Sequence, residues 1–281
     1  MTNTLQKFLL NNLDVRGAII HLDTAWREVL RRRNYDALIA ELLGQATAAT
    51  LLMGANIKFE GSLLLQLQSQ GDLPLMLVQS DNRCRFRSLA KFVGQTPRSL
   101  TKMAIDGVIM IAVESQMSDK PYQGVVSIHS DQLSDNIETY FNRSEQLQTI
   151  LVLRADNEQA AGILLQVLPD AKISEDDWTR LRHLAATLNL TELKTADTQT
   201  MIKRIFAEDD KIVYEPTSAA FECGCSVERT LAMLAGLDEK ELREIVAAGE
   251  SVVVGCDFCG KKYQHDAATI AALLSNKIHP N

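Results

Sequence analysis

Apolar and polar positions in the first part of the chain alternate between strand-like and helix-like patterns. Residues 15–22 are a strand candidate, and Asp23 can cap a helix that follows directly. Asp36 can cap a second helix, from residue 37 to about 53, in which apolar or small residues occur nearly all round. We expect this second helix to be buried and to end at Gly54.

Several strand-like runs follow, separated by turn residues. A helix is expected at about 134–141, and the runs that predict strands are 57–68, 73–78, 83–87, 108–113, 124–128, 149–153 and 162–168. Short connections such as Gly71-Asp72 favour antiparallel neighbours, and strands do not alternate regularly with helices. Residues 1–172 are therefore predicted to form one α+β domain with a mixed sheet.

One of these runs also raises a question of chemistry. Arg83, Arg85 and Arg87 alternate with Cys84 and Phe86, which is the period of a half-buried strand. Cys84 is then expected on the inward face as a core residue, without a reactive role. The three arginines are interpreted as a solvated strand face rather than a nucleic-acid patch.

Residues 173–220, called the linker segment below, have a different character. Ser174 to Asp177 forms a capping box and an acidic first turn for one helix. A second helical stretch, 190–206, has sparse apolar positions and must dock on a neighbour to be stable. The segment can be an ordinary interdomain connection, or a metastable element whose order depends on what flanks it.

Residues 221–281 predict a small module of helices plus a hairpin. Ser226 can cap a first helix, Asp238 and Glu241 form a capping box for a second, and Asp266 can cap a third. Residues 251–254 and 262–265 are expected to pair as strands.

Charge and length exclude several classes of protein. At 281 residues the chain exceeds one typical core, and its net charge of −7 argues against a general nucleic-acid or anionic-membrane binder. No apolar run approaches the ~20 residues of a membrane span, and the N-terminus lacks the features of a secretory signal. We therefore expect a cytoplasmic protein, in a compartment that keeps thiols reduced.

Residues 1–172 offer no chemistry that the sequence places together. They contain no Gly-rich phosphate loop and no nucleophile elbow. The histidines are scattered along the chain and are interpreted as structural or exposed: His21, His129, His183, His265 and His279. The sequence thus predicts a protein that is not an enzyme.

The strongest chemical signal is the arrangement of cysteines. Four of the five lie in two tight pairs, Cys223 with Cys225 and Cys256 with Cys259, separated by residues 226–255. Two such pairs can hold one tetrahedral metal ion, typically Zn²⁺, in a closed site that leaves no position for a catalytic water. Without the metal, each pair is also close enough to form a local disulfide. A purely structural zinc site and four unligated core cysteines are the competing interpretations.

The size of the module makes the metal important for its folding. About 60 residues form a marginal core, and structural zinc supplies ~10–16 kcal/mol of apparent folding free energy. Removing the ion should therefore unfold residues 221–281. Oxidation of the thiolates would have the same effect, and the weak helices of the linker segment are the part most exposed to it.

The cysteine pairs, together with Val213-Tyr214-Glu215-Pro216, resemble the heat shock protein 33 family of redox-regulated chaperones. Three motifs of the N-terminal half agree with this resemblance: Val15-Arg16-Gly17, Tyr140 ahead of Ser144-Glu145-Gln146, and 162–169. The resemblance spans essentially the whole chain.

The resemblance implies an ATP-independent holdase that is inactive when reduced and zinc-bound. It implies Cys223, Cys225, Cys256 and Cys259 as ligands of one Zn²⁺ and as partners in two disulfides, Cys223–Cys225 and Cys256–Cys259. Oxidation would release zinc, unfold the module and the linker segment, and favour a homodimer that binds unfolding client proteins. Cys84 matches no motif position and is assigned no role.

Two other functions remain open on the residues alone. A constitutive protein-binding module would use zinc only structurally. A thiol oxidoreductase would use Cys256 and Cys259, but such a pair normally opens a helix, and the pair at 223–225 has no place in that mechanism.

Overall fold

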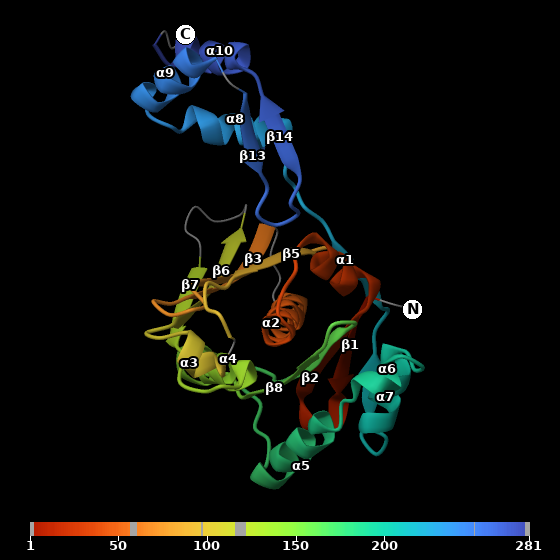
Figure 1. Cartoon of the computed structure of the whole chain (residues 1–281). Helices are drawn as coiled ribbons and strands as arrows, with labels where there is room; N and C mark the ends of the chain where they lie inside the picture. Colours follow the sequence, from red (N-terminus) through yellow and green to blue (C-terminus); the bar gives the residue numbers. More distant parts are fainter. Residues whose placement is uncertain (1–2, 57–60, 97, 116–121, 250, 279–281) are drawn as a thin grey trace. The chain divides into compact units, whose positions relative to one another are not determined.

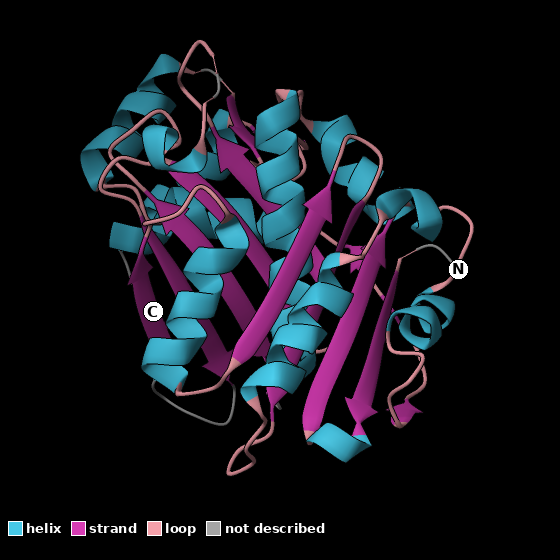
Figure 2. Cartoon of the chain, turned by 90° about the horizontal axis from the view of Figure 1, so that it is seen from below, coloured by secondary structure: helices cyan, strands magenta, loops and turns pink. Residues whose placement is uncertain are grey.

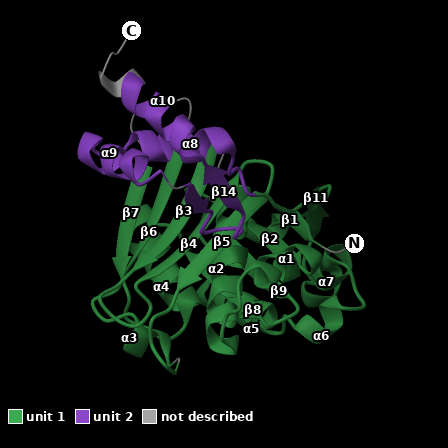
Figure 3. Cartoon of the chain, turned by 45° about the horizontal axis from the view of Figure 1, so that its top comes forward, with its two compact units in different colours: residues 1–222 green, residues 223–281 purple. Residues whose placement is uncertain are grey.

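The structure, a computed structural model, describes residues 3–56, 61–96, 98–115, 122–249 and 251–278. It divides into two compact units, Met1–Glu222 and Cys223–Asn281, which Figure 3 colours separately. The predicted α+β class is confirmed, since the first unit combines antiparallel sheets with helices and the second is a helical module with one hairpin.

The first unit contains two six-stranded sheets. In the first sheet the order is β10-β1-β2-β9-β8, with β11 also paired to β1, and every pairing is antiparallel. Its strands are β1 (Thr4–Leu10), β2 (Val15–Leu22), β8 (Thr149–Ala155), β9 (Ala160–Val167), β10 (Lys211–Val213) and β11 (Thr217–Ser218).

The second sheet has the order β12-β5-β4-β3-β6-β7. Its pairings are antiparallel except for β12 with β5, which is parallel. Its strands are β3 (Gly61–Gln68), β4 (Leu75–Asp81), β5 (Arg85–Lys91), β6 (Val108–Ser115), β7 (Tyr122–Ser127) and β12 (Ala220–Phe221).

Helix α2 (Ala37–Asn56) lies between the two sheets (Figure 1). Its buried residues belong to one large apolar cluster with residues of both sheets, as its all-round apolar pattern predicts. The other helices of this region are α1 (Thr24–Arg32), α3 (Leu100–Met103) and α4 (Leu133–Tyr140), with a 3-10 turn at Asn11–Leu13 and a π-helical turn at Phe141–Glu145.

Helix α2 corrects two expectations. It continues through Gly54 to Asn56 instead of ending at the glycine. It is also long and apolar enough, by length and composition, to cross a membrane, so the expectation that no such run exists is wrong. Because 72% of its apolar window is buried inside the unit, its composition is that of a core helix.

Three further local expectations are wrong. Strand β1 was not expected from the sequence. Asp23 does not cap α1 through its side chain, because the Asn3 Oδ1 atom accepts the N–H groups of Asp23 and Ala25 at 2.9 and 3.0 Å. Cys84 lies in the turn before β5, at a positive φ of 58°, because the Asp81 carboxylate accepts backbone N–H groups of that turn. Cys84 is nevertheless buried, and burial raises the pKa of its thiol.

The linker segment folds against the first sheet and is counted within the first unit. It contains α5 (Glu175–Ala186), α6 (Leu190–Leu193) and α7 (Thr198–Ile205). The single helical stretch expected at 190–206 is therefore two shorter helices, α6 and α7. The break follows from Asp197, whose carboxylate caps α7 by accepting the Thr200 N–H at 2.7 Å. Figure 2 views the protein from the side on which these helices lie.

The docking of these helices is apolar. Their buried residues form a second cluster with the outward face of the first sheet: Leu181, Ala185, Leu188, Leu193, Met201, Ile202, Ile205 and Phe206 against Phe8, Leu10, Val15, Ile19, Ile163 and Leu165. The rings of Phe8 and Phe206 have centroids 5.3 Å apart. The sparse apolar positions of 190–206 therefore all face one way, as a docked helix requires.

The chain after α7 joins both sheets. Strands β10 and β11 extend the first sheet beside β1, and β12 then pairs with β5 of the second. The Glu222 N–H donates to the Phe86 carbonyl at 2.8 Å, and the Arg85 guanidinium donates to the Glu222 carboxylate at 2.9 Å. The end of the linker segment is thus fixed by backbone pairing immediately before Cys223.

The second unit has a much smaller core. It consists of α8 (Val227–Ala235), α9 (Glu239–Ala248), β13 (Val252–Gly255), β14 (Lys262–His265) and α10 (Ala267–Ile278). The predicted capping box of α9 is present, with Gly249 left-handed at its C-terminus. Among the described residues, its apolar cluster has four buried side chains, Leu234, Leu242, Val254 and Ile270, with six partly buried ones packed against them. So small a core contributes little net stability once chain entropy is counted.

We predict that Phe206→Ala loosens the linker segment. The side chain is fully buried against Phe8, and its loss should cost about 3–5 kcal/mol. Thermal unfolding of the reduced protein, together with limited proteolysis within 173–210, measures the effect. The matched control is Ile212→Ala in β10, whose side chain is 47% exposed; equal losses in the two variants would contradict the docking described here.

Candidate metal centre

The four cysteines of the two predicted pairs lie together in the second unit. Cys223 and Cys225 precede α8, whose N-cap Ser226 accepts the Arg229 N–H. Cys256 and Cys259 lie in the turn between β13 and β14. The Sγ atoms of Cys223 and Cys256 are 3.5 Å apart, those of Cys225 and Cys259 are 3.3 Å apart, and all four lie within 4.8 Å of one another.

The turn that carries the second pair is closed by the backbone. The Gly260 N–H donates to the Cys256 carbonyl at 2.8 Å, and the Cys256 N–H donates to the Lys261 carbonyl at 2.9 Å. Gly260 has a φ of 71°, a left-handed conformation in which a side chain would be strained. A glycine therefore suits the position directly after Cys259.

Beside the first cysteine pair, the Arg229 side chain lies close to the backbone of Gly224. A Cβ atom at residue 224 would lie 2.8 Å from the Arg229 Nη1 atom, so Gly224 leaves room for that guanidinium beside the cysteines. A cation at this place offsets part of the negative charge that ionised cysteines would bring.

The thiols influence one another strongly. Burial raises the pKa of Cys223 to about 12, and burial likewise raises the pKa of Cys259. Burial also opposes ionisation of Cys225, but the Tyr263 hydroxyl donates to its Sγ at 3.1 Å, and this bond with those from the other cysteines lowers its pKa to about 7. A cluster of this kind holds few negative charges unless a cation joins it.

The donor set fits a metal ion. Four sulfurs bound to Zn²⁺ at ~2.3 Å in a tetrahedron lie ~3.8 Å from one another, close to the separations found here. Among the described residues, this is the group of cysteine, histidine or acidic side chains that meets the conditions for holding such an ion. The ring of Tyr263 adds a further cation contact, with the Lys261 Nζ 5.0 Å from its centre.

Sequence reasoning missed two contributors to this site. Tyr263 supplies the hydroxyl that reaches Cys225, and His265 contacts the Thr230 hydroxyl at 2.9 Å, which ties β14 to α8. Alternation along β14 is the signal that could have placed both side chains inward, since Tyr263 and His265 are its buried positions. Of the other histidines, His21 is buried and contacts Gln159, whereas His279 lies outside the described residues.

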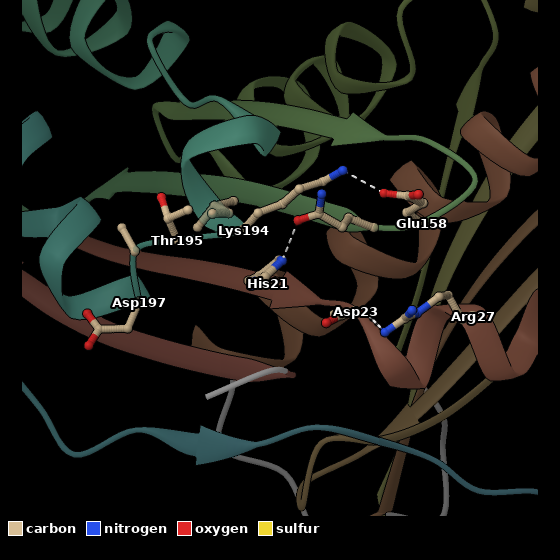
Figure 4. Close-up of a pocket in the computed structure, with 10 residues that line it drawn as sticks. His21, Asp23, Arg27, Glu158, Lys194, Thr195 and Asp197 are labelled. Carbon is tan, nitrogen blue, oxygen red and sulfur yellow. Dashed lines mark hydrogen bonds and ion pairs between the residues drawn. The ribbon is translucent and has the colours of Figure 1, made fainter.

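A second feature concerns the docking of the linker segment. A polar cavity of about 450 Å³ lies where residues 193–197 meet β2, α1 and the turn between β8 and β9 (Figure 4). Lys194 and Glu158 form an ion pair across it at 2.5 Å, with both side chains more than half exposed. An exposed pair contributes about 0–1 kcal/mol, so this edge of the segment is weakly attached.

Helix α5, at the start of the linker segment, is attached to the first unit more firmly than the edge at Lys194. The Arg182 guanidinium donates to both carboxylate oxygens of Glu138 at 3.1 and 3.0 Å, and the same carboxylate accepts the Leu151 N–H at 2.7 Å. Bidentate pairs of this kind are stronger than single contacts. Attachment thus weakens from α5 towards α6.

Fold and site together define a protein with a large sheet unit and a small unit in which four clustered cysteines could hold a metal ion. The sequence model of the family described as Hsp33 protein matches residues 3–266. A 33 kDa chaperonin of Nitrosococcus oceani is 36% identical over 98% of this chain and 96% of its own length. One of Vibrio vulnificus is 34% identical over 97% and 95%.

The fold agrees with these matches. The crystal structure of a 33 kDa chaperonin from Thermotoga maritima, a heat shock protein 33 homolog, superposes with a TM-score of 0.84 at 19% identity and covers 99% of both chains. The chain belongs to the Hsp33 family. The resemblance found in the sequence is confirmed, and the family supports the prediction of a chaperone.

We predict that Cys256→Ser lowers bound metal well below one ion per chain and unfolds the second unit, because a serine hydroxyl is a poor replacement for a thiolate ligand. Metal analysis and far-UV circular dichroism measure the two effects. Cys84→Ser is the matched control, since Cys84 lies in the other unit, and it should keep full metal content. Unchanged metal content in Cys256→Ser would contradict the ligand assignment.

Metal binding should also depend steeply on pH. Cys223 and Cys259 have raised pKa values and hold their protons near neutrality, yet they must be ionised to bind a metal. Each proton released weakens binding about tenfold for every unit of falling pH, so at least two such protons give about a hundredfold. Stability supplied by the metal is therefore present at higher pH and lost as pH falls. Chelator competition at pH 8, 7 and 6 measures it, and a flat profile would contradict the thiolate site.

Proposed function

We propose that this protein is a redox-regulated, ATP-independent holdase of the cytoplasm. In the reduced state its four clustered cysteines bind one Zn²⁺ and the protein is inactive. Oxidation converts it to a form that binds unfolding client proteins and prevents their aggregation. The observation that carries the proposal is the cluster of four reduced sulfurs in a unit whose buried apolar core is four side chains.

The redox step acts on the cysteines themselves. Two thiol groups that form a disulfide lose two protons and two electrons, and a peroxide that accepts them is reduced to water or an alcohol. We infer the pairs Cys223–Cys225 and Cys256–Cys259. Two disulfides use all four sulfurs, so no thiolate remains to bind the ion. The second unit then loses the interaction on which its folding depends.

Local disulfides replace little of that stability. The loops that they close contain one and two residues between the cysteines, and the entropic stabilisation by a disulfide grows with the length of its loop. Oxidation of the second unit thus favours the unfolded chain. This is why we propose that the cysteines act as a switch rather than as an alternative structural brace.

The linker segment is the element that the switch releases. Cys223 follows Glu222 directly, and Glu222 is fixed to β5 by its N–H and its carboxylate. An unfolded tail pulls on that pairing, and the linker segment beyond it includes the weakly attached edge at Lys194. We propose that linker release then follows from heat or further oxidation.

Release of the segment would expose two apolar surfaces. One is the buried side of the helices, with Leu181, Ile202 and Phe206, and the other is the sheet face that they cover, with Phe8 and Ile163. Newly exposed apolar area of this kind binds other apolar surfaces. We propose that clients use one or both surfaces, and that the same exposure favours a homodimer of the oxidised protein.

A peroxide titration of the zinc-loaded protein tests the proposal. Released zinc, far-UV circular dichroism and suppression of client aggregation should change together, and dithiothreitol should reverse them. Phe206→Ala should hold clients at a lower peroxide dose, because its linker segment is already loosened. Zinc release without any gain in holding activity would leave only a structural zinc site in a constitutive binding module.

Peptide mapping of the oxidised protein tests the disulfide pairs separately. The proposal expects one bridge within 223–225 and one within 256–259. In the reduced cluster the shortest sulfur contacts cross between the pairs, from Cys223 to Cys256 and from Cys225 to Cys259. Crossed bridges would close loops of more than thirty residues and would stabilise the second unit, contrary to the proposed switch.

A further inference from the structure

The three N-terminal motifs of the sequence analysis meet around one cavity of the first unit. Arg16 comes from β2, Gln166 from β9, and Tyr140 and Glu145 from α4 and the π-helical turn. Arg16 and Gln166 are direct partners in the antiparallel register of β2 and β9. The cavity is about 260 Å³ in volume, and its apolar lining is Met53, Ile111, Val113, Phe141, Leu147 and Leu164. Neither the cysteine switch nor the linker segment uses these residues.

Arg16 is a cation with only a neutral partner. Its Nε donates to the Gln166 Oε1 at 3.0 Å, and its Nη2 donates to the same oxygen. Gln166 is itself oriented, since its Nε2 donates to the Thr149 hydroxyl at 2.9 Å. Among the ion pairs of the described residues none includes Arg16. Its side chain is half-buried, and burial lowers its pKa.

The carboxylate of the cavity is already engaged elsewhere. The hydroxyl of Tyr140 donates to the Glu145 Oε1 at 2.6 Å, and the hydroxyl of Tyr122 donates to the same atom. Burial and this bond raise the pKa of Tyr140 far above its usual range, so the phenol remains a donor. Gly124 permits this arrangement, because a Cβ atom there would collide with the Tyr140 ring. Glu145 thus bonds to phenols, and no ion pair joins it to Arg16 among the described residues.

A second donor lines the same cavity without a partner. The Nδ2 atom of Asn56, at the end of α2, is buried and has no hydrogen-bond partner among the described residues. A buried donor without an acceptor costs about 1–3 kcal/mol. Arg16 and Asn56 together therefore present N–H groups and a positive charge to a space whose walls are otherwise mainly apolar.

We propose that this cavity is a binding site for a small carboxylate with an apolar body. The carboxylate lies against the Arg16 guanidinium and the Asn56 amide, and the apolar body contacts Met53, Val113 and Leu164. The volume is that of about nine water molecules at ~30 Å³ each, so the ligand has about ten non-hydrogen atoms. A hydrophilic anion would leave the apolar walls unused, and a neutral apolar molecule would leave the Arg16 guanidinium with the neutral Gln166 as its acceptor among the described residues.

The site is independent of the redox state of the cysteines. Its walls come from β2, β6, β9, α2 and the π-helical turn, all within the first unit and on the side of the first sheet that faces α2. The linker helices cover the opposite face of that sheet. A bound carboxylate therefore connects both sheets of the first unit and stabilises it whether or not the second unit is folded.

Octanoate, which has ten non-hydrogen atoms, is a suitable test ligand, with octanamide as its neutral counterpart. Calorimetric titration of the full-length, reduced, zinc-loaded protein should show one octanoate site with a dissociation constant of about 1 mM or tighter. Octanamide should bind at least about tenfold more weakly, because it has no charge to pair with Arg16. Equal affinities of the two ligands, or no octanoate binding, would overturn the proposal.

Variants locate the site. Arg16→Gln should weaken octanoate binding at least about tenfold and leave octanamide binding nearly unchanged. Arg31→Gln, at an exposed arginine of α1, is the matched control and should bind octanoate normally. If Arg16→Gln is poorly folded by circular dichroism, Leu147→Trp gives the answer instead, since it fills the cavity from a half-buried position and should abolish binding of both ligands. Octanoate binding that survives both changes contradicts this location.

Discussion

The central physical constraint of the second unit is the close approach of four cysteine sulfur atoms. These atoms lie within 4.8 Å of one another, and among the described residues the apolar cluster of this unit has four buried side chains. Burial makes two of these thiols resist ionisation, as the raised pKa values of Cys223 and Cys259 indicate. A cation that binds all four sulfurs as thiolates would offset the repulsion between their negative charges. Protonation, metal binding and oxidation of the sulfurs would then all change the folding equilibrium of the second unit.

The first unit is stabilised in the opposite way, by two sheets that enclose α2 in a large apolar cluster. The linker segment combines firmly and weakly attached parts. Phe206 and its neighbours are fully buried on the first sheet, whereas the edge at Lys194 borders a polar cavity and is attached by an exposed ion pair. The edge of the segment at Lys194 is therefore attached more weakly than the buried side of α7 that follows it.

The two candidate sites use different physical principles. The four clustered cysteines of the small unit could hold a metal ion. The cavity at Arg16 lies in the well-packed unit, where an oriented guanidinium and an unpartnered Asn56 amide meet apolar walls. Because the two faces of the first sheet are covered separately, one by α2 and the other by the linker helices, carboxylate binding and linker release need not interfere with each other.

Local spacing and pattern predicted the two cysteine pairs that cluster in the structure, the capping box of α9 and strand β2, because each depends on residues near one another in sequence. Local patterns could not place Cys84 in a turn, end α2 at Asn56 or join Arg16 to Gln166 across 150 residues. Those outcomes depend on which strands pair and what covers them. The sequence therefore predicted a possible metal site, whereas tertiary packing alone decided where the linker segment docks and where Arg16 meets an apolar cavity.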